Sequence, residues 1–224
     1  MRNFLLSFIF WLLPFCMFAQ DPIELFDQFN GQYDFTAIGN TLNLEDNSVG
    51  GLCDILTASS ADLNLLPGQN VIAALLYWGG SGPGDFDVTL ASGFTTANII
   101  STRNFNITPF GDGSGREFFG AYADVTSFVQ NAGNGTYRLS DLDLTGVIAP
   151  YCPSGTNFGG WSITVIYDDP SFLMNQISVF DGFDSVSQLN NDIEFTLDGL
   201  LVTSSDFAKI GFLAWEGDFD IAEG

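Results

Sequence analysis

The chain has 224 residues, of which 46% are hydrophobic, and it carries 27 Asp+Glu against 5 Lys+Arg, for a formal net charge of −22. It contains no histidine, which excludes Ser-His-Asp and Cys-His catalytic arrangements and histidine-ligated zinc sites. An acidic field of this strength repels phosphate backbones and anionic membranes, so the composition argues against nucleic-acid binding. The 23 phenylalanines supply apolar area that acidic disordered chains lack, which favours a folded domain with a sizeable core.

The first residues have the pattern of a secretion signal. Arg2 provides a positive charge and residues 4–18 form an almost unbroken apolar run, which predicts a cleaved signal peptide over residues 1–19. A transmembrane anchor is an alternative, but spanning takes roughly 20 apolar residues, and this run is shorter and contains Pro14. A lipoprotein signal ending at Cys16 is a second alternative, although the residue before that cysteine is not small.

The mature chain reads as successive strands separated by Gly, Asn, Asp and Pro. Residues 71–78 (VIAALLYW) form a continuous apolar run bounded by Gly68 and Gly79, which predicts a strand buried on both faces. Further strands are predicted, in chain order, at residues 87–90, 99–103, 117–122, 136–139, 161–167, 176–180, 193–197 and 209–215.

One short helix is predicted at residues 124–130 (DVTSFVQ), with Asp124 as its cap and with Val125 and Phe128 on one face. No other segment has sustained helical periodicity. The pattern therefore predicts an all-β fold, an antiparallel β-sandwich of jelly-roll type with at most one short helix. We expect a single domain over residues 20–224. Because a strand-like segment ends nine residues before Gly224, we also expect the chain to be a fragment of a longer polypeptide.

Two cysteines, Cys53 and Cys152, remain after cleavage of the signal peptide. In an oxidising compartment an even pair predicts a disulfide, which stabilises a loop of this length by about 4–5 kcal/mol in the chain-entropy model. Two unpaired buried thiols are the alternative.

The carboxylates could in principle carry chemistry, because glycoside hydrolysis needs only a pair of acids about 5–10 Å apart. Glu117 and Glu194, both in predicted strands, are the candidates for such a pair. Carboxylates are so abundant here that their presence specifies nothing. We therefore assign no catalytic residue and expect the protein not to be an enzyme.

Calcium is the better-motivated cofactor, because it takes 6–8 hard oxygen ligands, often from loop carboxylates. The sequence offers several close pairs of aspartates, and the residues predicted to contribute to a site are Asp168, Asp169, Asp181 and Asp184. No stretch fits a calcium loop of the EF-hand type, so such a site would be assembled across loops. The alternative is that these side chains are simply solvated.

The aromatic residues fall into two groups. Trp78, Trp161 and Trp215 lie at the edges of apolar runs, which predicts core packing. Tyr151 and Phe158 lie in the same predicted loop as Cys152 and are candidate surface contacts for a ligand.

Four phrases together resemble an N-terminal β domain of large secreted surface proteins of Bacteroidetes, particularly flavobacteria: residues 74–82 (ALLYWGGSG), 121–136 (AYADVTSFVQNAGNGT), 159–183 (GGWSITVIYDDPSFLMNQISVFDGF) and 209–218 (KIGFLAWEGD). Those proteins often end in a gliding-motility-associated sorting domain that the type IX secretion system reads. The resemblance implies an extracellular all-β domain of an adhesin-like protein with no assigned catalytic residues. It also implies a cysteine pair at Cys53 and Cys152.

These observations predict a secreted or outer-surface domain with a structural or interaction role, adhesin-like and non-catalytic. Its expected partners are other surface proteins or glycans, with no nucleic acid and no membrane insertion of the mature domain. A carbohydrate-binding module is the first alternative and would present exposed aromatics in a shallow groove. A secreted carboxylate-based glycoside hydrolase is the second.

Overall fold

A computed structural model of the chain describes residues 21–109, 113–187, 189, 191–201 and 208–215. The predicted signal peptide at residues 1–19 lies outside these described residues. The secondary structure elements, in chain order, are β1 (Asp21–Gly31), β2 (Tyr33–Thr41), β3 (Ala58–Leu63), β4 (Asn70–Ser81), β5 (Asp87–Ser92), β6 (Thr95–Ile100), β7 (Arg103–Ile107), β8 (Phe118–Asp124), α1 (Thr126–Ala132), β9 (Gly135–Ser140), a 3-10 turn (Cys152–Ser154), β10 (Gly159–Asp168) and β11 (Asn175–Phe183).

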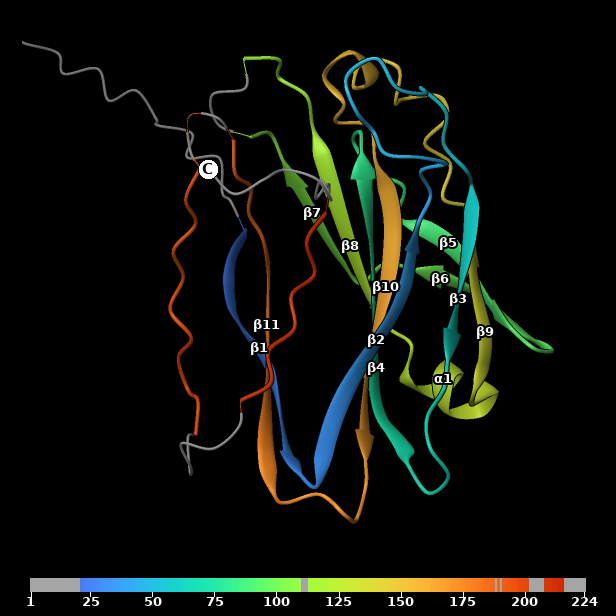
Figure 1. Cartoon of the computed structure of the whole chain (residues 1–224), viewed down its shortest axis with the longest axis vertical. Coiled ribbons are helices and arrows are strands. Elements are labelled where there is room, and N and C mark those ends of the chain that lie inside the picture. Colours follow the sequence, from blue (N-terminus) through green and yellow to red (C-terminus); the bar gives the residue numbers. More distant parts are fainter. Residues whose placement is uncertain (1–20, 110–112, 188, 190, 202–207, 216–224) are drawn as a thin grey trace, which may run out of the picture.

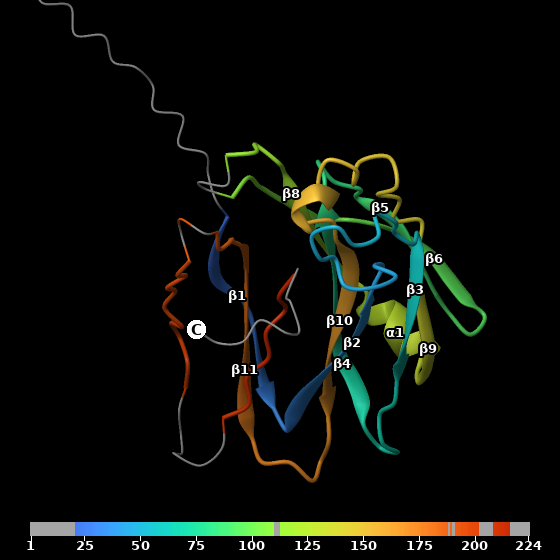
Figure 2. The ribbon, with the colours of Figure 1, turned by 45° about the horizontal axis from the view of Figure 1, so that its top comes forward.

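The strands form three antiparallel sheets that stand as layers (Figure 1). A five-stranded sheet in the order β2-β10-β4-β8-β7 packs against a four-stranded sheet in the order β3-β9-β5-β6. β1 and β11 pair as a separate ribbon, which covers the other face of the five-stranded sheet (Figures 1 and 2). The predicted all-β sandwich is therefore confirmed, and the ribbon adds a third layer that the sequence did not indicate.

The main core lies between the two larger sheets. Trp78 on β4 and Trp161 on β10 are its largest side chains, and both are fully buried. Each indole nitrogen donates a hydrogen bond, Trp78 to the backbone oxygen of Asp85 at 2.8 Å and Trp161 to Oγ of Ser59 at 2.8 Å. These bonds satisfy the one polar atom that each ring takes out of water, and they confirm core packing for both tryptophans.

A second core lies between the five-stranded sheet and the ribbon. Successive side chains of a strand point to opposite faces, so on β4 Leu76 faces the main core and Leu75 faces the second core. This confirms the prediction that residues 71–78 are buried on both faces. The ribbon contributes mainly partly buried side chains to this second core: Phe26, Phe29, Ile177, Val179 and Phe183.

The helix prediction is confirmed with a shift of two residues, because α1 begins at Thr126. The prediction of Asp124 as the cap is wrong by one residue, because the N-cap is Val125 and makes no side-chain capping bond. Asp124 instead accepts a hydrogen bond at Oδ1 from the backbone N–H of Thr126 at 2.8 Å, just before the first turn. Phe128 and Val129 are the buried residues of the helix.

The strand predicted at residues 99–103 is wrong, because this segment contains the crossing between two sheets. β6 ends at Ile100 and β7 begins at Arg103. Between them the N–H of Ser101 donates to Phe86 and the N–H of Thr102 donates to Tyr122. The β-propensity of residues 99–103 is continuous, but within this segment the chain passes from the four-stranded sheet to the five-stranded sheet.

The strands predicted at residues 193–197 and 209–215 are also not formed. Within the described residues, the only backbone–backbone hydrogen bond in these segments joins Asp198 to Thr196. Alternation of apolar residues predicts an extended backbone, but a strand also needs a neighbouring edge in register. Neither segment pairs with a strand in the part of the chain that the structure describes.

Candidate functional site

The extended segments 193–201 and 208–215 carry several exposed apolar side chains, and they run on the two sides of the ribbon of β1 and β11 (Figures 1 and 2). Phe212 is 75% exposed and Leu201 is 66% exposed. The large apolar side chains that are exposed along these two segments are Phe195, Leu197, Leu200, Leu201, Ile210, Phe212 and Leu213. We call these seven side chains the apolar surface.

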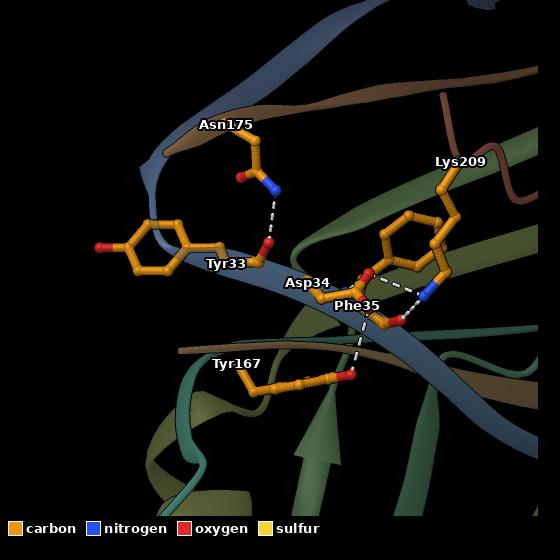
Figure 3. Close-up of polar contacts among 6 residues, drawn as sticks. All are labelled: Tyr33, Asp34, Phe35, Tyr167, Asn175 and Lys209. Carbon is orange, nitrogen blue, oxygen red and sulfur yellow. Dashed lines mark hydrogen bonds and ion pairs between the residues drawn. The ribbon is translucent and has the colours of Figure 1, made fainter. Parts of the chain in front are cut away.

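Segment 208–215 is anchored at one end through Lys209. Its Nζ lies 2.7 Å from Oδ1 of Asp34, donates to the backbone oxygen of Phe35 at 2.6 Å and stands 4.4 Å from the centroid of the Phe35 ring (Figure 3). The hydroxyl of Tyr167 donates to the other oxygen of Asp34 at 3.3 Å. Burial, followed by the charge of Asp34, raises the pKa of Tyr167, so this hydroxyl stays a donor.

The other end of segment 208–215 is held by Trp215 on a row of glycines. Gly160, Gly79 and Gly120 are direct cross-strand neighbours on β10, β4 and β8. A Cβ atom added at Gly160 would lie 3.4 Å from the Trp215 ring, and one added at Gly120 would lie 3.4 Å from the Phe183 ring. The absence of side chains along this row therefore leaves room for two aromatic rings on the sheet.

The ribbon is tied to the sheet by an ion pair whose carboxylate is buried. Nη1 of Arg103 on β7 lies 2.5 Å from Oδ2 of Asp181 on β11, and the Asp181 side chain is 1% exposed. The hydroxyl of Tyr77 on β4 donates to the same oxygen at 3.2 Å. Burial raises the pKa of the Tyr77 hydroxyl, and the nearby charge of Asp181 raises the same pKa further. The Tyr77 hydroxyl therefore remains protonated. The guanidinium also lies 4.6 Å from the Phe26 ring centroid.

A cavity of about 540 Å³ lies between the ribbon and segment 193–198. Its apolar lining comes from both sides, with Phe180 on β11 and Phe195 on the segment. Four carboxylates also line it, those of Glu24, Asp184, Glu194 and Asp198. The remaining described residues that line it are Pro22, Ile23, Leu25, Ile193 and Thr196, so its lining contains no lysine or arginine.

The four aspartates predicted to bind calcium lie in different settings. Asp168 accepts hydrogen bonds from the backbone and side-chain nitrogens of Asn70, both at 2.9 Å. Asp169 accepts a bond from Oγ of Ser171 at 2.6 Å, which lowers the pKa of its carboxyl. Asp181 is paired with Arg103, and Asp184 lines the cavity.

Among the residues that the structure describes, no group of three or more histidines, cysteines and acids is placed to hold a metal ion. The structure thus does not bring the four predicted aspartates together as such a group. Calcium binding stays a prediction.

Tyr151 and Phe158 are buried rather than on the surface, with exposures of 6% and 8%. The hydroxyl of Tyr151 donates to the backbone oxygen of Glu117 at 2.7 Å. Phe158 stacks between Phe118 and Trp215, with ring centroids 5.8 Å and 6.4 Å away. Their loop folds back over the end of the sheet, which sequence reasoning could not anticipate. A ligand contact by either residue stays a prediction.

The two glutamates considered for hydrolysis belong to different features. Glu194 lines the cavity, whereas Glu117 lies just before β8 and is not among the described residues that line it. Glu117 contributes its backbone oxygen to Gly82 and to Tyr151.

The predicted disulfide joins Cys53 and Cys152, whose Cα atoms lie 5.5 Å apart. It connects the loop before β3 with the 3-10 turn before β10. The two loops also approach each other at Gly155, where an added Cβ would lie 2.4 Å from the backbone oxygen of Asn47. The cross-link therefore closes one end of the sandwich.

No family model matches this chain, and searches of curated proteins and of solved structures found no match either. The resemblance to surface proteins of Bacteroidetes therefore stays a prediction. In the part of the chain that the structure describes, no helix is long and apolar enough to cross a membrane.

Proposed function

We propose that this chain is an extracellular interaction or structural domain at the cell surface, adhesin-like and without catalytic activity. The observation that carries the proposal is the apolar surface on segments 193–201 and 208–215. Large exposed apolar side chains that gather along a segment often mark a site of protein interaction. A well-packed sandwich that nevertheless keeps these side chains in water is suited to presenting them to a partner.

Two further features support an extracellular setting. The Cys53–Cys152 disulfide is of a kind that persists in oxidising compartments. The net charge of −22 keeps a protein with an exposed apolar surface soluble. Neither feature requires an enzyme.

For the carbohydrate-binding alternative, the three tryptophans offer no exposed platform, and the exposed aromatics among the described residues are phenylalanines such as Phe195 and Phe212. Trp78 and Trp161 are buried in the main core, and Trp215 packs against Phe158.

For the hydrolase alternative, the candidate pair is not brought together, because the cavity at Glu194 is not lined by Glu117. Glu194 shares that cavity with Glu24, Asp184 and Asp198, so a carboxylate pair there stays a prediction.

The proposal is tested on intact cells of the source organism and on beads coated with the mature chain. Antibodies against the domain should label unpermeabilised cells, and coated beads should adhere to those cells. Changing Leu201 and Phe212 to serine should reduce adhesion several-fold, because it removes two of the most exposed members of the apolar surface.

The matched control is Phe94→Ser. Phe94 is fully exposed, but it lies in the turn between β5 and β6, away from the ribbon. This change should leave adhesion unaltered. Absence of surface label, or equal loss of adhesion in both variants, would overturn the proposed function.

A further inference from the structure

The cavity between the ribbon and segment 193–198 combines an apolar lining with carboxylates, and both of its walls are extended backbone. We propose that it binds a cationic peptide strand, in which lysine or arginine alternates with apolar residues. This inference rests on the proposed interaction function and names the class of partner.

The size and lining of the cavity suit such a strand. Its volume of about 540 Å³ falls in the usual range for ligand sites. Phe180 and Phe195 offer contact to apolar side chains. Successive side chains of extended backbone alternate in direction, so along segment 193–198 Glu194 and Asp198 share one side and Ile193 and Phe195 the other. A strand beside this segment can place its cationic side chains on the first side and its apolar side chains on the second.

The charge of the site selects for cationic groups. Four of the eleven lining residues are acids and none is basic. A cleft lined by charge of one sign concentrates its field and attracts the opposite charge. A second copy of this chain would bring its own net charge of −22 to the site, so self-association is disfavoured.

The backbone around the cavity can accept an added strand. Among the described strands β1 pairs with β11 alone, and this pairing is irregular between Asp21 and Glu24, a stretch that includes the lining residues Pro22 and Ile23. Segment 193–198 is extended without pairing to any described strand. Unpaired extended backbone is the usual template for strand addition, in which the main chain supplies affinity and alternate side chains supply specificity.

The test measures binding of the mature chain to a fluorescent seven-residue peptide in which lysine alternates with valine, by fluorescence anisotropy at low salt. We expect saturable binding that weakens as salt is raised. A peptide with glutamate in place of lysine should not bind. A peptide of the same composition with its lysines in one block should bind at least severalfold more weakly, because it lacks the alternation.

The decisive variant combines Glu194→Gln and Asp198→Asn, which removes two charges from the lining. It should weaken binding about tenfold, which corresponds to about 1.4 kcal/mol. The control combines Asp46→Asn and Asp87→Asn, two exposed aspartates outside the lining. It changes the net charge equally and should leave binding within about twofold.

Equal weakening by both pairs would mean that the overall field binds the peptide, and this would overturn the inference. Equal binding of the blocked peptide, or of spermine, would overturn it as well, because no strand is then needed. If the peptide fails to bind while bead adhesion still depends on Leu201 and Phe212, the inference falls and the proposed function stands.

Discussion

Asp181 on β11 makes the polar contacts that join the ribbon to the five-stranded sheet. Its carboxylate is almost fully buried, and burial of a charge is costly unless a partner of opposite charge accompanies it. Arg103 supplies the charge and Tyr77 supplies a neutral hydrogen bond. One aspartate thus connects β11 to both β7 and β4.

We expect Arg103→Leu to lower the free energy of unfolding by about 3 kcal/mol, because it leaves a buried carboxylate without its cation. Urea unfolding followed by tryptophan fluorescence measures this. Arg138→Leu, at an exposed position on β9, is the control and should change stability by less than about 0.5 kcal/mol. Equal effects of the two substitutions would show that the ion pair with Asp181 contributes nothing.

At the scale of the element, segment 208–215 is held at its ends rather than along its backbone. Lys209 binds Asp34, and Trp215 lies on the row of glycines at Gly79 and Gly160. The sequence contains the signal for this row as two Gly-Gly pairs, but only the register of β4 and β10 shows that the pairs are neighbours. Register is a non-local property, so the row could not be predicted from either strand alone.

We expect Trp215→Ala to increase the rate of tryptic cleavage after Lys209. Aromatic pairs contribute about 0.5–1.5 kcal/mol beyond their burial, so losing the stack on Phe158 should raise the open population up to about tenfold. Timed digestion with mass spectrometry of the fragments measures the rate. Phe212→Ala, on the exposed side of the same segment, should leave it unchanged. An unaltered rate in Trp215→Ala would mean that this ring does not hold the segment.

At the scale of the whole molecule, the sequence was sufficient for the fold class but not for the third layer. Apolar runs such as residues 71–78 and 161–167 predicted strands correctly, because their apolar composition indicates burial without knowledge of their neighbours. β1 and β2 were missed because their sequences mix polar and aromatic residues. The burial of these residues depends on the ribbon, which forms only when β1 pairs with β11, more than a hundred residues away. The burial of Tyr151 and Phe158 was missed for the same reason, since their loop is placed by tertiary contacts.

The disulfide also acts at this scale, because the chain between Cys53 and Cys152 contains every strand from β3 to β9. Both larger sheets contain strands from the loop that the disulfide closes, so unfolding either sheet unfolds part of that loop. The separation of 99 residues corresponds to about 4–5 kcal/mol in the chain-entropy model, so we expect the double substitution Cys53→Ser and Cys152→Ser to lower stability by that amount.

Urea unfolding of the mature chain with and without reductant measures this loss. Reductant should destabilise the unsubstituted chain by a similar amount and should have no effect on the double variant. A loss below about 1 kcal/mol would contradict the prediction. It would mean that the unfolded chain without the disulfide keeps residual structure that restrains it nearly as strongly as the covalent bond does.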